Sequence, residues 1–197
     1  MADAPQIDAD RAYTLLGALG EQLALRSEKF TIAVVGGSAL LALGLVSRAT
    51  RDVDVVAVLY GEELVSAEPL PAVLLEAVGV VAADFGLASD WLNAGPASML
   101  EMGLPEGFLA RVQHRRYGPA LTVLFASRLD QIHFKLYAVV DLGTGRHLAD
   151  LQALAPTAAE LLGAARWTRT HDPSEGYLAV LLQVLDHFGV EHGPDDV

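Results

Sequence analysis

Residues 34–56 read VVGGSALLALGLVSRATRDVDVV and decide the fold of this chain. The stretch predicts a buried apolar strand, a Gly-Gly-Ser turn, an apolar helix and a loop, followed by a second buried strand. Two carboxylates, Asp52 and Asp54, stand one residue apart where the second strand begins. This succession of strand, helix and strand predicts a small sheet with a helix packed beside it.

The amino-acid composition limits the classes of protein to which this chain can belong. The chain has 197 residues, 52% of them apolar, and no cysteine, which predicts a folded core and excludes disulfides and cysteine-based zinc sites. The N-terminal MADAPQIDADRAY lacks the basic and apolar regions of a signal peptide. The apolar runs at 31–46 and 70–83 are too short to cross a membrane. We therefore expect a cytoplasmic protein with no membrane partner.

Periodicity and helix caps predict the remaining elements. The predicted helices span 8–27, 39–46, 70–84, 97–102, 106–113, 127–141 (or 130–141), 146–155, 157–169 and 174–188. The predicted strands span 30–35, 53–59 and 120–126, and a further short strand within 85–118 stays open. Ser38 is the expected N-cap of the second helix. The order predicts an α+β fold, with a small mixed β-sheet flanked by helices over 1–155. A helical C-terminal extension over 156–197 is expected to pack on it as one structural unit.

Asp52 and Asp54 are candidate metal ligands. Side chains alternate along a strand, so both carboxylates point to one face, where they repel each other unless a cation or proton lies between them. Mg²⁺ is commonly held by one or two carboxylates together with substrate phosphates. The alternative is a pair of solvent-facing acids that interact with Arg48 or Arg51.

Gly36, Gly37 and Ser38 form a candidate phosphate-binding turn. Two glycines let the backbone approach a ligand closely, the following helix presents free N–H groups to an anion, and Ser38 adds a hydroxyl donor. The alternative is a tight strand-to-helix turn with an ordinary serine cap.

Together, Gly-Gly-Ser, thirteen intervening residues and Asp-Val-Asp resemble the signature of the polymerase β-like nucleotidyltransferase superfamily. With Arg48 and Thr50, the R-x-T-x-D-h-D arrangement (h, apolar) resembles the minimal bacterial nucleotidyltransferases of the AbiEii-type toxin group. The resemblance implies that the glycine–serine loop holds the triphosphate, that Arg48 and Thr50 order the loop or contact phosphate, and that the two aspartates bind Mg²⁺ and position the nucleophile. An acceptor then attacks the α-phosphate and pyrophosphate leaves.

Residues 130–154, DQIHFKLYAVVDLGTGRHLADLQAL, resemble the downstream element of the same group. Lys135 aligns with a lysine that contacts the nucleotide's phosphates, where it would offset charge on the leaving pyrophosphate. Asp150 aligns with an acid of that element. The alternative is structural: Lys135 extends from a buried helix to solvent or pairs with Asp150 across two helices.

The chain also departs from the family pattern. The superfamily usually carries a third carboxylate on a later strand, but the predicted strand over 120–126 has no acid, so Asp150 is the candidate substitute. The family usually has Lys-Asp where this chain has Arg146-His147. Residues 90–93, Asp-Trp-Leu-Asn, predict a cap, a buried aromatic and an amide, and Asn93 is a candidate for binding base or ribose.

One local cluster of basic residues stands out, since the net charge of −12 disfavours broad nonspecific binding to nucleic acid. It consists of Arg111, His114, Arg115 and Arg116, which would hold an acceptor RNA backbone or form a solvated helix end.

The resemblance implies Mg²⁺-dependent transfer of a nucleoside monophosphate from an NTP to an RNA (tRNA) or protein acceptor. By analogy, the setting is the toxin of a toxin–antitoxin pair, with an antitoxin protein as partner. Two alternatives stay open: a catalytically weak or inactive nucleotide-binding module, and a structural domain in which both blocks are coincidental.

Overall fold

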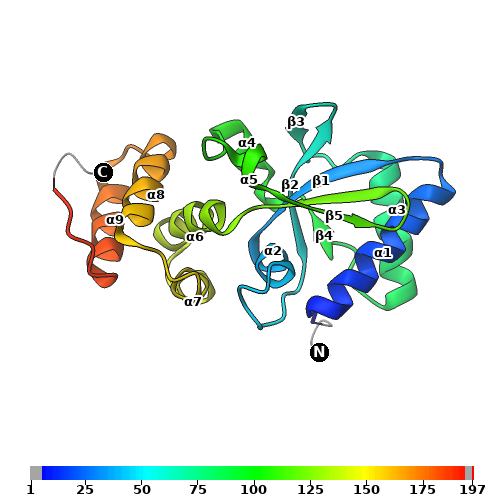
Figure 1. Ribbon diagram of the computed structural model, residues 1–197, viewed down its shortest axis with the longest axis horizontal. Coiled ribbons are helices and arrows are strands. Elements are labelled where there is room, and N and C mark those ends of the chain that lie inside the picture. The colour runs from blue at the N-terminus through cyan, green and yellow to red at the C-terminus, as the bar shows by residue number, and fades with distance from the viewer. Residues whose placement is uncertain (1–5, 194–196) are drawn as a thin grey trace. The chain divides into compact units, whose positions relative to one another are not determined.

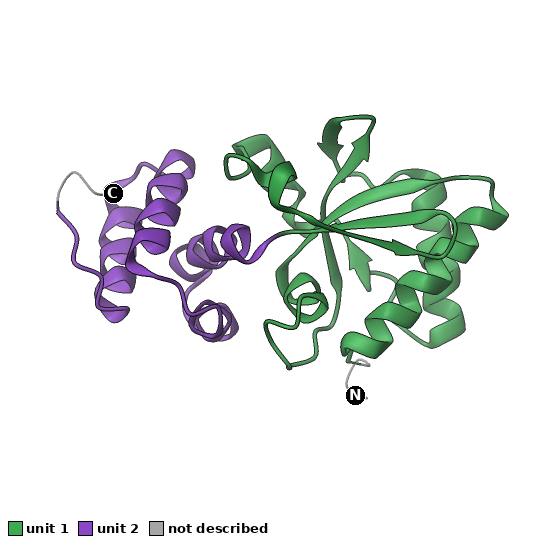
Figure 2. Cartoon of the chain, viewed as in Figure 1, with its two compact units in different colours: residues 1–126 green, residues 127–197 purple. Residues whose placement is uncertain are grey.

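The computed structural model describes residues 6–193 and 197, and its fold is α+β, as predicted (Figure 1). The chain divides into two compact units, residues 1–126 with the sheet and residues 127–197 with helices (Figure 2). The boundary predicted at residue 155 falls inside the second unit. The reason is that helix α6 (Arg128–Leu142) packs on α7 (Arg146–Ala153), α8 (Ala158–His171) and α9 (Glu175–His187).

The sheet of the first unit is mixed and six-stranded, with the order β3-β2-β1-β6-β5 and with β4 paired to β2. The strands are β1 (Phe30–Val35), β2 (Val53–Tyr60), β3 (Glu63–Ser66), β4 (Leu92–Asn93), β5 (Gln113–Tyr117) and β6 (Leu121–Phe125). The pairs β1–β6 and β2–β4 are parallel and the others antiparallel. The three predicted strands are confirmed as the adjacent strands β2, β1 and β6.

One face of the sheet, here called the first face, forms the core with helices α1 (Ala9–Leu25) and α3 (Ala72–Phe85). Alternate residues of β1 and β6 enter this core, namely Phe30, Ile32, Val34, Leu121, Val123 and Phe125. Because side chains alternate along a strand, the residues between them, including Thr31, Val35 and Thr122, belong to the opposite, second face. Helices α1 and α3 confirm the predictions over 8–27 and 70–84.

Helix α2 (Gly36–Ala42) begins directly after β1, so the prediction that Ser38 caps a helix over 39–46 is wrong. Val35 is the N-cap and Ser38 lies in the first turn, because Gly36 adopts a φ of 71° and turns the chain at once. Further along, the turn η1 (Gly95–Ala97) leads into α4 (Ser98–Met102), which confirms the predicted helix over 97–102.

The basic cluster is divided between a helix end and a strand. Arg111 is the last residue of helix α5 (Phe108–Arg111), whereas His114, Arg115 and Arg116 lie on the edge strand β5. Residues 113–117 pair with β6 through their backbones, so the helix predicted over 106–113 is shorter than expected and is followed by a strand.

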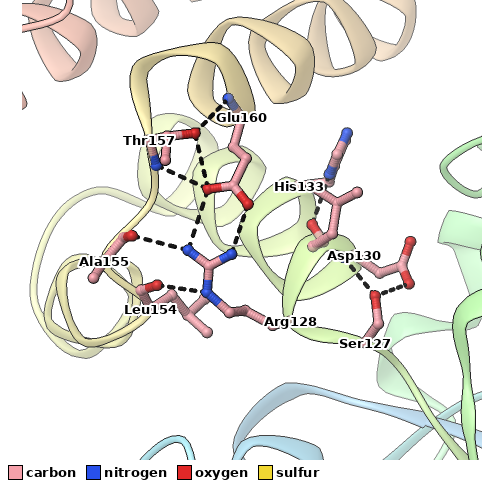
Figure 3. A network of polar contacts seen from close by, with 9 residues as sticks. Ser127, Arg128, Asp130, His133, Leu154, Ala155, Thr157 and Glu160 are labelled. Atoms are coloured by element: carbon pink, nitrogen blue, oxygen red, sulfur yellow. Dashed lines mark hydrogen bonds and ion pairs between the residues drawn. The ribbon is translucent and has the colours of Figure 1, made fainter.

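Side chains cap three helices of the second unit: Ser127 caps α6, Thr157 forms a capping box with Glu160 at α8, and Ser174 caps α9. Arg128 ties these elements together, since it donates to the carbonyl oxygens of Leu154 and Ala155 at 2.8 Å and forms an ion pair with Glu160 at 2.6 Å (Figure 3). Within the described residues, no helix is both long and apolar enough to span a membrane.

Candidate functional site

The predicted phosphate loop and one of the predicted metal ligands meet where β1 ends. Val35, the last residue of β1, pairs in register with Asp54 on β2. A Cβ added at Gly36 would lie 2.5 Å from the Asp54 carboxylate oxygen Oδ2, closer than real side chains approach. Both this contact and the positive φ require glycine at position 36. The Asp54 carboxylate therefore lies directly against the backbone of the loop.

Gly37 makes the corresponding approach to the other half of the motif. A Cβ added there would lie 2.9 Å from Thr50 Oγ1 and 3.7 Å from Arg48 Nη2. Thr50 in turn donates a hydrogen bond from Oγ1 to Asp52 Oδ1 at 3.3 Å. The loop, the two residues of the R-x-T segment and both aspartates are thus gathered within the first unit.

Two backbone tethers fix the segment that carries the aspartates. Thr50 exchanges two backbone hydrogen bonds with Ile7, at 2.7 and 2.9 Å. Val53, which lies between the two acids, donates its N–H to the carbonyl oxygen of Trp91 at 2.7 Å. Both carboxylates are half-buried on a backbone held from two sides. No sequence pattern pointed to Ile7, because an isolated bridge has no periodicity.

Within residues 90–93 the predicted buried aromatic is confirmed, and Asn93 lies beside the site. Trp91 is buried and donates its indole N–H to the carbonyl oxygen of Val78 at 3.1 Å. Asn93 pairs in register with Asp54 in the parallel β2–β4 ladder. Its Oδ1 accepts the Gly95 N–H at 2.8 Å, so the amide oxygen already closes a turn. Binding of base or ribose by Asn93 stays a prediction.

Ser38 is turned differently from the two glycines. Its side chain is buried, and its hydroxyl donates to the carbonyl oxygen of Val35 at 3.5 Å. It lines a cavity of about 220 Å³ together with Tyr13 and Arg115. Neither Asp52 nor Asp54 lines that cavity. A phosphate contact from the Ser38 hydroxyl stays a prediction, whereas the backbone of Gly36 and Gly37 lies against the motif.

Lys135 and Asp150 form a buried ion pair within the second unit. Lys135 Nζ lies 2.8 Å from Asp150 Oδ2, between α6 and α7, and the two side chains are only 7% and 1% exposed. The pairing is the structural alternative foreseen from the sequence. It gives both residues a role in joining the two helices. The predicted contact of Lys135 with phosphates and the predicted role of Asp150 as third acid are not tested by this pair.

The chemistry of the side chains in the first unit indicates which metal ion they could bind. Asp52 and Asp54 offer carboxylate oxygens, the ligands that Mg²⁺ prefers, and a magnesium ion commonly completes its shell with water and substrate phosphates. Strand β6 carries no acid, as predicted. Among the described residues, no group of three or more histidines, cysteines or carboxylates is placed to hold a metal ion.

The structure gathers the predicted site residues in two places. In the first unit these are Gly36, Gly37, Ser38, Arg48, Thr50, Asp52 and Asp54, and in the second unit Lys135 and Asp150. The first group contains the residues predicted to bind a nucleotide and a metal ion, and the second contains an ion pair of opposite charges. When the chain is compared with known proteins, no protein-family model, curated protein or solved structure matches it.

Proposed function

We propose that the protein is a nucleotidyltransferase that transfers a nucleoside monophosphate from an NTP to an RNA or protein acceptor with Mg²⁺. The observation that supports this proposal most strongly is the contact between the Asp54 carboxylate and the bare backbone at Gly36. This contact brings a carboxylate, a glycine with a positive φ and a second aspartate together in one place. A cation and a phosphate bound there would account for all three features.

In this proposal each residue has a defined task. Asp52 and Asp54 hold Mg²⁺, which when bound supplies positive charge to the triphosphate. The loop at Gly36 and Gly37 is proposed to hold the phosphates that share the ion with Asp54, whose carboxylate lies against this loop. Helix α2 has only seven residues, so this role rests on close approach rather than on a helix dipole. Thr50 orients Asp52 through its hydrogen bond.

Lys135 is the proposed phosphate ligand from the second unit. Its ion pair with Asp150 sets the ammonium group in one position, and a positioned cation stabilises charge that develops on a leaving pyrophosphate. Asp150 is then a positioning residue for Lys135. By analogy with the toxin group, we place the protein in the cytoplasm, as the toxin of a pair with an antitoxin protein and with tRNA among the possible acceptors.

The test is transfer of label from each α-labelled NTP, with Mg²⁺, to total tRNA or to lysate protein. Asp54→Asn removes one proposed metal ligand, and Asp84→Asn, an exposed acid on α3, is the matched control. Transfer should fall at least about 100-fold in Asp54→Asn, since even residues that only orient metal ligands are worth about 10–100-fold. It should be unchanged in Asp84→Asn.

The alternative function is a nucleotide-binding module, favoured by the absence of an acid on β6. Equilibrium dialysis with labelled NTP separates the two. Mg²⁺-dependent binding that Asp54→Asn abolishes, without transfer to any acceptor, supports the module. Absence of both binding and transfer in the wild-type protein would contradict the enzyme and the module together.

A further inference from the structure

A row of polar side chains crosses three strands on the second face of the sheet, at the end away from Asp54. Thr31 on β1 pairs in register with Thr122 on β6, and Thr122 pairs with Arg116 on β5. Paired residues on neighbouring strands point to the same face. The two hydroxyls and the guanidinium group therefore lie side by side across β1, β6 and β5.

These residues line a groove of about 340 Å³, which also includes Lys29, directly before β1, and which we call the Lys29–Arg116 groove. Its lining residues include two cations and no aspartate or glutamate. The chain as a whole carries 25 acidic and 13 basic residues. An acid-free groove with two cations is therefore a local reversal of the charge of the protein.

The donors of this groove are not used by the fold. Lys29 and Arg116 are exposed, and neither side chain forms a hydrogen bond or an ion pair with another residue in the described part of the chain. Ammonium, guanidinium and hydroxyl groups all donate hydrogen bonds to phosphate oxygens, and Arg binds a phosphate through two parallel bonds.

A structural explanation covers only part of this pattern. Charged residues on an edge strand prevent it from pairing with another chain, and β5 is an edge strand. That argument accounts for Arg116. It does not account for Lys29, which lies outside β5, or for Thr31 and Thr122, whose strands β1 and β6 are interior.

We propose that the Lys29–Arg116 groove binds the phosphodiester backbone of single-stranded RNA. Its part in docking the acceptor rests on the proposed function, whereas phosphate binding as such does not. Val35 pairs with Asp54, and Thr31 precedes Val35 by four residues on the same face of β1, which is ~13 Å of strand. An RNA held in the groove is thus about four stacked nucleotide steps from the proposed metal ligands.

The test measures binding of a short fluorescein-labelled single-stranded RNA by anisotropy, without NTP, as the potassium chloride concentration is varied. The variant is Lys29→Gln/Arg116→Gln. The matched control is Arg146→Gln/Arg166→Gln, which removes the same charge from exposed positions of the second unit. Thermal unfolding of each variant shows that it is folded.

The groove variant should bind at least about 10-fold more weakly, and its slope of log K against log salt should be shallower by about 1.4, the value for two lost phosphate contacts on a single strand. The control should keep the wild-type slope. Equal slopes in both variants, or tighter binding of an acidic peptide than of RNA, would overturn the proposal. If RNA binding depends on the groove but no label is transferred, the result supports the groove proposal and contradicts the proposed enzyme.

Discussion

The two polar clusters of this protein differ in how their charges are arranged. Lys135 and Asp150 are almost wholly buried, and each neutralises the other at 2.8 Å. Asp52 and Asp54 are half-buried, carry the same charge and lie beside glycine backbone. The first cluster joins opposite charges between two helices, whereas the second places like charges together at a glycine turn. The comparison teaches that like charges held together are a more informative sign of an ion-binding site than a buried pair of opposite charges.

The largest expected effect is on the buried pair. Lys135→Ala removes the ion-pair partner of the buried Asp150 and should lower the free energy of unfolding by about 3–5 kcal/mol, measured by urea denaturation. Lys135→Met/Asp150→Leu removes both charges and should recover most of this loss.

The double variant also decides whether the pair is only structural. If it is stable and transfers nucleotide at the wild-type rate, Lys135 has no role in catalysis and the contrast between the two clusters is complete. If it is stable and inactive, Lys135 belongs to the nucleotide site as proposed.

The next effect isolates the contact between the loop and Asp54. Gly36 and Gly44 have nearly equal φ values, 71° and 69°, but a Cβ at Gly44 meets nothing within 4 Å. Both Gly→Ala variants carry the backbone strain of about 1–3 kcal/mol. Only Gly36→Ala should also lose Mg²⁺-dependent NTP binding, measured by dialysis. Equal loss of binding in the two variants would show that strain, and not the approach to Asp54, is responsible.

A smaller effect concerns the ion pair that fixes the start of α8. The hydrogen bond from Arg128 holds the pKa of Glu160 at about 2, below its usual 4.5 (Figure 3). Because the folded protein has the lower pKa, the stabilisation is present above pH 4.5 and is lost as the pH falls towards 2. Glu160 is partly exposed, so the contribution is about 1 kcal/mol.

The measurement for this pair is the urea midpoint at several pH values. The wild-type midpoint should fall more between neutral and acidic pH than that of Glu160→Gln. Parallel curves for the two proteins would contradict the assignment.

The smallest effect is on the stability of the acidic pair. Asp52→Asn should leave the free energy of unfolding unchanged or raise it by up to about 1 kcal/mol, because it relieves repulsion between two carboxylates. A clear loss of stability, measured by thermal unfolding, would mean that Asp52 is kept by the fold for its hydrogen bond with Thr50, and the contrast between the clusters would weaken.

The central fold could be predicted because its signals are local and strong. The β-branched runs of β1, β2 and β6 and the caps at Ser127 and Ser174 each identify one element. Strand β3 was not predicted, because Glu-Leu-Val-Ser is short. A short strand within 85–118 was left open, but its position at β5 could not be predicted, because Gln-His-Arg-Arg-Tyr is polar. Edge strands of this kind become strands through their neighbours, and no periodicity within them indicates it.

The site was predictable to a similar extent. The spacing of the motif indicated that Gly36 and Asp54 belong together, and the structure places them in contact. The start of α2 was predicted wrongly, because a serine after two glycines favours a cap and the sequence does not show that Gly36 turns the chain one step earlier. For Lys135, two partners were conceivable, and only the packing of α6 on α7 shows the one it has.

The bridge between Ile7 and Thr50 has a practical consequence for anyone who expresses this protein. A recombinant chain that begins at Asp8 would lack both backbone hydrogen bonds that hold Thr50, and with them one of the two anchors of the aspartate segment. An affinity tag joined close to Ile7 would crowd the same place. Recombinant chains should therefore keep Ile7 and the residues before it, so that both hydrogen bonds to Thr50 can form.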